Sequence, residues 1–153
     1  MKRMRDIVRL PVLKLQTGEH LGWVKDILFD EKKCIVTGII LEKDSFLTPH
    51  TQIISRDDIV ACAKDSLNVK EFTNEKVNGS LWSHKIGNKV YNDQGEQIGT
   101  VGDIFVDNTF KDITGYEISD GLFADLFDGR GAILEKNIIA DGKDVIIVEG
   151  GSL

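Results

Sequence analysis

The sequence predicts a mainly β protein built from two tandem small antiparallel β-barrels, with one short helix in the second. Three observations lead to this fold class: an internal repeat, a series of short apolar segments separated by turn residues, and 15 glycines among 153 residues. Because a barrel removes exposed sheet edges, it suits units of such small size.

The repeat is a block at residues 18–30 that recurs at residues 95–107 with a constant offset of 77. The identical positions and Thr-Gly pairs make up the repeat signature, whose glycines and aspartates are Gly18, Gly22, Asp26, Asp30, Gly38, Gly95, Gly99, Asp103, Asp107 and Gly115. A later block, Ile59-Val60-Ala61, returns as Ile138-Ile139-Ala140 with an offset of 79. Ordered blocks with small insertions between them indicate duplication. We therefore expect one domain at residues 5–74, a second at 82–150, and a linker at about 75–81.

Each unit reads as short strands joined by turns. In the first unit they are expected at residues 8–15, 21–29, 34–41, 53–54, 59–60 and 67–72. Val8, Leu10 and Val12 alternate as a half-buried strand requires, Gly18 supplies a turn, and Gly22 suggests a bulge. The one helix is expected at 120–129, bounded by Asp120 and Gly129.

Charge and composition exclude several classes of protein. The net charge of −6 argues against direct nucleic-acid binding, which depends on basic surfaces. The charge is uneven, because residues 1–76 carry 13 Lys/Arg against 12 Asp/Glu and residues 77–153 carry 6 against 13. No apolar run is long enough for a transmembrane segment, and no apolar region follows the basic start. Cys34 and Cys62 form no CxxC motif, so we expect a reduced, cytoplasmic protein without a zinc site.

The signature in residues 11–30, with Thr37-Gly38 after it, resembles the PRC-barrel family, and the whole chain resembles two tandem copies, as in small stand-alone bacterial members. That family is named for the cytoplasmic domain of the photosynthetic reaction-centre H subunit and includes a domain of a 16S rRNA maturation factor. The resemblance implies a small β-barrel that serves as an interaction module or adaptor, and it does not imply an enzyme. The second unit departs from the pattern at Asn88-Lys89, where the first has Leu10-Pro11.

Four aspartates are the most tempting chemical residues: Asp26, Asp30, Asp103 and Asp107. Paired carboxylates can perform acid/base catalysis or hold a hard cation. However, four residues along an extended strand place two carboxylates about 13 Å apart, too far to share an ion. We therefore interpret the signature residues as structural turn or edge positions, and we expect no catalytic residue, metal site or cofactor.

The remaining reactive residues have plain interpretations. His20, His50 and His84 are isolated from one another and from other ligands, so surface positions are expected. Cys34 and Cys62 adjoin apolar segments and are expected to be small buried side chains.

The candidate interface consists of Leu122, Phe123, Leu126, Phe127 and, at its rim, Arg130. The four apolar side chains would share one helical face. They could plug a barrel end or join the two units, or they could form an exposed patch that docks a protein partner or a second copy of the chain.

The basic start, with Lys2, Arg3, Arg5 and Arg9, has two interpretations. It is a frayed terminus, or it makes a weak peripheral contact with an anionic lipid surface or RNA.

Three functions follow as hypotheses. The first is a non-enzymatic protein-interaction adaptor with an unknown protein partner, which the absence of a catalytic constellation favours. The second is a ribosome- or RNA-processing-associated factor, which rests only on the family resemblance. The third is a metal-binding protein that uses the repeated aspartates.

Overall fold

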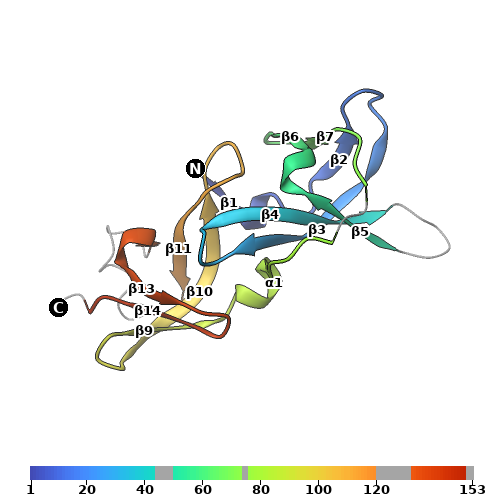
Figure 1. The fold of residues 1–153 in the computed structure, drawn as a ribbon. Helices are drawn as coiled ribbons and strands as arrows, with labels where there is room; N and C mark the ends of the chain where they lie inside the picture. Colours follow the sequence, from blue (N-terminus) through green and yellow to red (C-terminus); the bar gives the residue numbers. More distant parts are fainter. Residues whose placement is uncertain (44–49, 74–75, 120–131, 151–153) are drawn as a thin grey trace.

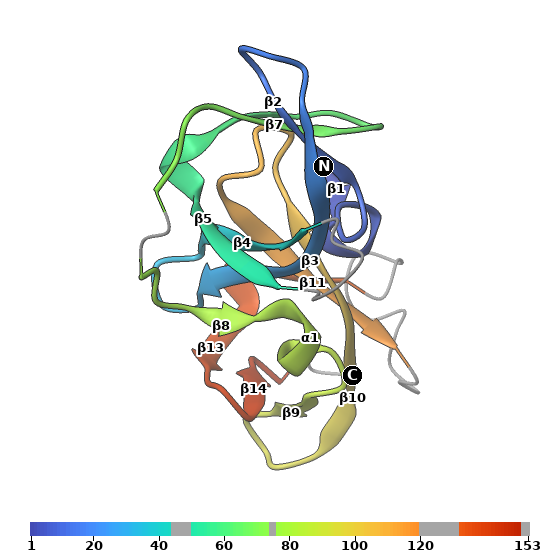
Figure 2. The same ribbon diagram turned by 90° about the vertical axis from the view of Figure 1, so that its right-hand side faces the viewer.

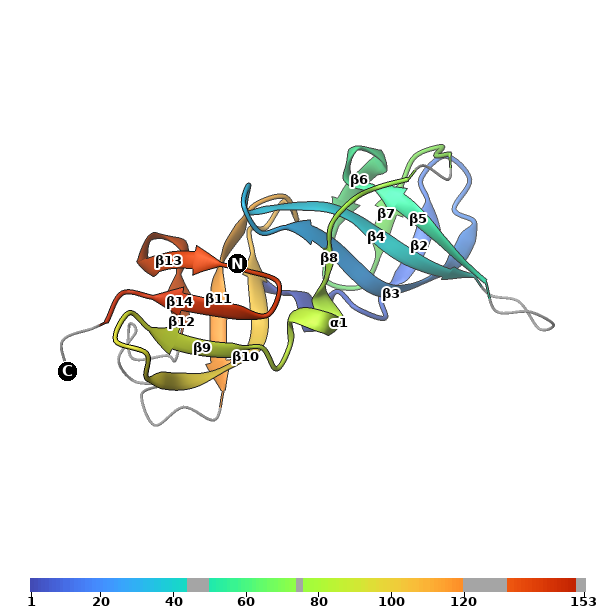
Figure 3. The same cartoon turned by 60° about the horizontal axis from the view of Figure 1, so that its bottom comes forward.

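The structure is a computed structural model that describes residues 1–43, 50–73, 76–119 and 132–150. Its strands form two seven-stranded sheets, each with six strands from one half of the chain and one from the other, so the predicted mainly β fold of two barrel-like units is confirmed (Figure 1). The helix expected at 120–129 lies outside the described residues. Seen from below, the two sheets lie end to end with a short helix at their junction (Figure 3).

The first sheet has the hydrogen-bonded order β5-β4-β3-β2-β7-β6. Its elements are β2 (Pro11–Lys14), β3 (His20–Asp30), β4 (Ile35–Lys43), β5 (Thr51–Ser55), the 3-10 turn η2 (Arg56–Asp58), β6 (Ile59–Cys62) and β7 (Leu67–Val69). All pairs are antiparallel except β2 with β7, which is parallel.

The second sheet repeats this order as β12-β11-β10-β9-β14-β13. Its elements are β9 (Lys89–Asn92), β10 (Gln97–Val106), β11 (Ile113–Ser119), β12 (Ala132–Leu134), the 3-10 turn η4 (Glu135–Asn137), β13 (Ile138–Asp141) and β14 (Val145–Val148). The equivalent pair, β9 with β14, is again parallel. Among the described strands, neither order returns to its first member, so each unit is barrel-like without being a closed ring.

The two units exchange their first strands. β1 (Lys2–Arg3) pairs with β10 of the second unit, and β8 (Ser80–Leu81) pairs with β3 of the first. The registers are equivalent: Lys2 opposes Val106 as Ser80 opposes Phe29. Each exchanged strand leads into a helical turn, η1 (Met4–Asp6) or α1 (Trp82–Lys85). Both exchanged strands fall outside the expected domain ranges 5–74 and 82–150. Figure 2 shows β8 and α1 between the two sheets.

The long hairpins of the two units also touch at their tips, with the same symmetry. The backbone N–H of Val36 donates to the carbonyl of Lys111, and that of Ile113 donates to the carbonyl of Cys34, each at 2.8 Å. Val36 and Cys34 of the first hairpin correspond, at the repeat offset of 77, to Ile113 and Lys111 of the second. The two hydrogen bonds are therefore equivalent in the two units. A pseudo-twofold axis therefore relates the units, as if the chain were a fused dimer.

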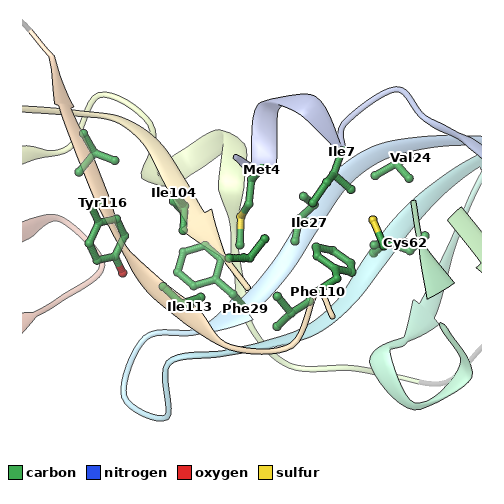
Figure 4. Close-up of a cluster of buried hydrophobic side chains, with 14 of the residues drawn as sticks. Met4, Ile7, Val24, Ile27, Phe29, Cys62, Ile104, Phe110, Ile113 and Tyr116 are labelled. Atoms are coloured by element: carbon green, nitrogen blue, oxygen red, sulfur yellow. The ribbon is translucent and has the colours of Figure 1, made fainter. Parts of the chain in front are cut away.

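One apolar core runs through both units. Met4, Phe29 and Phe110, all fully buried, belong to the same cluster as the core residues of both sheets. In Figure 4 side chains from the two halves of the chain form one continuous row. Because each unit has only about 75 residues, a shared core offsets the limited burial that one small unit achieves alone.

Gly22 marks the place where β3 passes closest to β4. Its φ is +152°, and a Cβ there would lie 2.0 Å from the carbonyl oxygen of Glu42. Gly18, in the preceding turn, has a φ of +71°, but a Cβ there would meet nothing within 4 Å. Gly22 is thus required by both the lack of space for a Cβ and its dihedral angle, whereas Gly18 is required by its dihedral angle alone.

We expect Gly22→Ala to lower the free energy of unfolding by about 3 kcal/mol or more, because a backbone atom cannot move aside for the added methyl group. Gly18→Ala is the matched control and should cost about 1 kcal/mol. Urea unfolding of both variants measures the difference. Equal losses would show that the close approach of β3 and β4 relaxes freely.

Candidate functional site

Asp26 joins the two units from the middle of β3. Its carboxylate accepts a hydrogen bond from the backbone N–H of Ser83 at 3.1 Å and another from the Ser83 hydroxyl. It also accepts from the N–H of Ile27 at 2.9 Å. Ser83 lies in α1, which follows the exchanged strand β8. Asp26 therefore holds the start of the second unit against the first.

Asp103 makes the equivalent contact in the other direction. It accepts from the backbone N–H of Arg5 at 3.3 Å and from Arg5 Nε at 2.7 Å. Trp82 Nε1 at 3.0 Å and the N–H of Ile104 at 2.8 Å complete its shell. The hydrogen bond to Asp103 raises the pKa of the Arg5 guanidinium above its ordinary value. Because Arg5 and Ser83 occupy matching places in their units, the two aspartates form one symmetric pair of clamps.

These contacts correct the expectation of turn or edge charges. Asp26 is 7% exposed and Asp103 is fully buried, so both carboxylates lie inside the junction. Each carboxylate accepts from a helical turn that follows an exchanged strand as well as from the next residue of its own strand, which accounts for the recurrence of both aspartates. A strand pattern alone could not reveal this role, because Ser83 and Arg5 each come from the other unit.

Asp30 and Asp107 have the turn role that the sequence suggested. Asp30 accepts from the N–H groups of Lys32 and Lys33, at 2.9 and 3.0 Å. Burial alone would raise the pKa of Asp107, but hydrogen bonds from the Lys111 N–H and its neighbours outweigh it and hold that pKa below its ordinary value. Within the described ranges, no group of three or more His, Cys, Asp or Glu side chains could hold a metal ion.

A buried polar network distinguishes the second unit from the first. Lys85 is 2% exposed, and its Nζ lies 2.5 Å from Asp141 Oδ1 and 2.7 Å from the carbonyl of Gly142. The hydroxyl of Tyr116 donates to the other oxygen of Asp141. Burial, with the nearby Asp141 charge, raises the pKa of Tyr116.

In the first unit the matching positions are apolar. Ile7, Ile39 and Cys62 stand where the second unit has Lys85, Tyr116 and Asp141. Burial raises the pKa of the Cys62 thiol, as expected of a small buried side chain. The two cores are therefore chemically different at equivalent places.

Glu31 of the first unit closes this network across the junction. Its Oε2 lies 3.7 Å from Lys85 Nζ, and its Oε1 accepts from the Ser80 hydroxyl. A pocket of about 520 Å³ opens beside Glu31 and Asp141. Since Asp141, Glu31 and the Gly142 carbonyl together face the ammonium group, its donors are engaged by the protein itself. The arrangement is a polar tie between units rather than a vacant binding site.

A second depression, which we call the tryptophan groove, lies on the first unit and has a volume of about 740 Å³. Its lining includes Val8, Arg9, Trp23, Lys25, Glu42 and Trp82. Trp23 is 40% exposed, and its ring meets that of His20 edge-on at 4.7 Å between centroids. Trp82 comes from α1 of the second unit, so both units contribute to this surface.

Arg9 lies in the groove in a strained backbone conformation. Its φ is +79°, which a side chain disfavours, and the matching residue of the second unit is Gly87 with a φ of +90°. Both residues donate the same backbone hydrogen bond, to Val24 at 2.7 Å and to Val101 at 2.8 Å. The fold therefore accepts glycine here, and the first unit carries arginine in spite of the strain.

Other groove positions are also specific to the first unit. Thr100, Gly102 and Ser119 replace Trp23, Lys25 and Glu42 in the second unit. The exposed aromatic ring and the charges are thus absent from the equivalent face. The groove is not among the sites predicted from the sequence, although Trp23, which departs from the repeat where the second unit has Thr100, is a signal for it.

The basic start is ordered within the fold, so the expectation of a frayed terminus is wrong. Lys2 Nζ donates to the carbonyl of Cys62, and Arg3 forms an ion pair with Glu117 at 2.8 Å. Arg5 is held by Asp103, as described above. Within the described part of the chain, neither Lys2 nor Arg9 forms an ion pair, but the Lys2 ammonium is bound by the Cys62 carbonyl, whereas the Arg9 side chain lines the tryptophan groove.

The other predicted residues are placed as follows. The candidate interface, Leu122, Phe123, Leu126, Phe127 and Arg130, lies outside the described residues. Cys34 differs from expectation, because it is only half-buried and occupies the hairpin turn with a φ of +55°.

Comparison with known proteins places the chain in a family. The PRC-barrel domain model matches residues 1–71 and again residues 81–153. The chain belongs to the PRC-barrel family. It is also 26% identical, over 98% of its length and 88% of the relative's, to the uncharacterized protein YrrD of Bacillus subtilis. Neither the family description nor the relative's name points to a catalytic activity. No helix in the described part of this PRC-barrel protein is long and apolar enough to cross a membrane.

The clamp at Asp103 is tested by Asp103→Asn, which removes the buried charge beside Arg5. We expect a loss of about 2 kcal/mol in the free energy of unfolding, because a buried amide cannot accept all the hydrogen bonds that the Asp103 carboxylate accepts from Arg5, Trp82 and Ile104. Asp30→Asn is the control, since that carboxylate only caps a turn, and it should cost about 1 kcal/mol. Urea unfolding gives both values, and hydrogen exchange should accelerate at residues 4–6. A loss no larger than the control's would remove Asp103 from its role as a clamp.

The strain at Arg9 is tested by Arg9→Gly, which installs the residue of the second unit. Relief of the left-handed conformation outweighs the extra freedom of glycine in the unfolded chain, so the Tm should rise by about 2 °C. Arg9→Ala keeps the Cβ and should give no rise. Calorimetry decides, and a lower Tm for Arg9→Gly would mean that the side chain is retained for packing.

Proposed function

We propose that the chain is a non-enzymatic protein-interaction adaptor that presents two different faces on one rigid body. The observation that carries this proposal is the reciprocal exchange of β1 and β8, which ties two units into one core while their equivalent surfaces differ. A rigid body loses little conformational entropy on binding, so it favours docking of partners at fixed relative positions. Membership of the PRC-barrel family agrees with such a role.

The charge distribution supports two distinct faces. The half of the chain before residue 77 is nearly neutral, with 13 basic and 12 acidic residues, whereas the rest has 6 basic and 13 acidic. Exposed apolar residues occur on both units, among them Trp23 at 40% and Ile139 at 55%. Surfaces that differ this much in charge select different partners.

The experiment is affinity purification of the full chain, after cross-linking in cells that express it naturally, with washes at about 0.5 M NaCl to screen weak surface charge. Trp23→Ser and Ile139→Ser alter one face each, and Lys89→Ala is an exposed control. We expect at least one protein to be retained by the parent and the control and lost from one variant only. Recovery of no protein that depends on either face would overturn the adaptor proposal.

A further inference from the structure

The tryptophan groove is cationic in an acidic protein. Arg9 and Lys25 line it, and neither forms an ion pair within the described residues, whereas Glu42 is the only carboxylate among the lining side chains. The chain as a whole carries −6. Two unpaired cations beside one half-buried acid therefore give this place a charge opposite to that of the protein.

The groove also carries features that cost stability without serving the fold. Trp23 leaves 40% of its surface in water, which is on the order of 100 Å² of aromatic surface. Arg9 keeps a left-handed backbone where the second unit has Gly87. Strain and exposed aromatic surface at one place are typical of a binding site.

We propose, on the basis of the adaptor function above, that the tryptophan groove docks an acidic peptide segment of a partner protein. A carboxylate of that segment pairs with Arg9, a second approaches Lys25, and an apolar side chain packs on the exposed ring of Trp23. Arginine suits this task because its planar group binds a carboxylate through two parallel hydrogen bonds.

An anionic membrane is the other surface that unpaired cations could meet, but the rest of the molecule opposes it. Lys2, Arg3 and Arg5 are engaged inside the protein, so the basic start supplies no cluster of free charges. Stable electrostatic attachment to lipid needs several free basic residues, and a net charge of −6 repels an anionic surface. A short acidic segment can reach the local cations while meeting the acidic second unit only at Trp82, an uncharged side chain.

The two tryptophans of the chain, Trp23 and Trp82, both line the groove, so intrinsic fluorescence reports directly on it. The first measurement is collisional quenching of the full-length protein by iodide and by caesium. A cationic groove concentrates iodide, so iodide should quench more strongly, and Arg9→Ala should reduce the ratio of the two quenching constants. Stronger quenching by caesium than by iodide would overturn the proposal.

The second measurement selects random peptides displayed on phage against the full-length protein, with counter-selection on Arg9→Ala. We expect enrichment of Asp and Glu around an apolar residue. The synthetic consensus peptide should shift tryptophan emission saturably, bind about tenfold more weakly to Arg9→Ala, and bind unchanged to Val60→Ser, which alters exposed apolar surface outside the groove lining.

Other outcomes count against the groove. No enrichment, enrichment of basic peptides, equal binding by Arg9→Ala, or an emission shift with phosphatidylserine vesicles but not with acidic peptides would each overturn the proposal. The adaptor function is judged separately, by affinity purification with the parent and with Arg9→Ala. If both retain the same proteins, the adaptor function is supported and the groove is not its docking site.

Discussion

The exchange of first strands between the units is the constraint on which the rest of the structure depends. β1 completes one side of β10 and β8 completes one side of β3, so each unit lacks a strand without the other. The buried carboxylates of Asp26 and Asp103 fix the turns that follow these strands. A buried carboxylate without donors would be strongly destabilising, so each clamp makes the exchange obligatory as well as favourable. The shared core and the two-sided tryptophan groove both follow from this geometry.

Duplication allows each position to be compared with its counterpart in the same molecule. Positions that keep their residue, such as the clamp aspartates, serve the architecture common to both units. Positions that differ are not fixed by the shared architecture. In the core, Lys85 of the second unit stands where the first has Ile7, and on the surface Trp23 of the first unit stands where the second has Thr100. The Lys85 difference is balanced inside the protein, by Asp141 and Glu31. The Trp23 side chain is 40% exposed, and the proposed docking site rests on this difference.

The sequence predicted the fold class and the duplication well, because both depend on local patterns that recur along the chain. Alternating apolar residues identify strands, and turn glycines such as Gly18 follow from backbone sterics. The exchange could not be predicted, because β1 and β8 are two residues long and carry no periodic signal. The same limit concealed the clamps, since Arg5 lies 98 residues from Asp103 in sequence. It also led to the wrong expectation of a frayed basic terminus.

The strain at Arg9 can be interpreted by comparing the two units at this position. An arginine at positive φ in a single, unrepeated unit shows only that the protein tolerates the strain, because there is no equivalent position with which to compare it. Here the second unit builds the same backbone hydrogen bond with Gly87, so the architecture itself does not need arginine. Natural sequences keep such a cost where function requires it. The guanidinium makes no ion pair inside the described part of the chain and lies in the groove where Trp23 is exposed, which is why the proposed docking of an acidic segment centres on this residue.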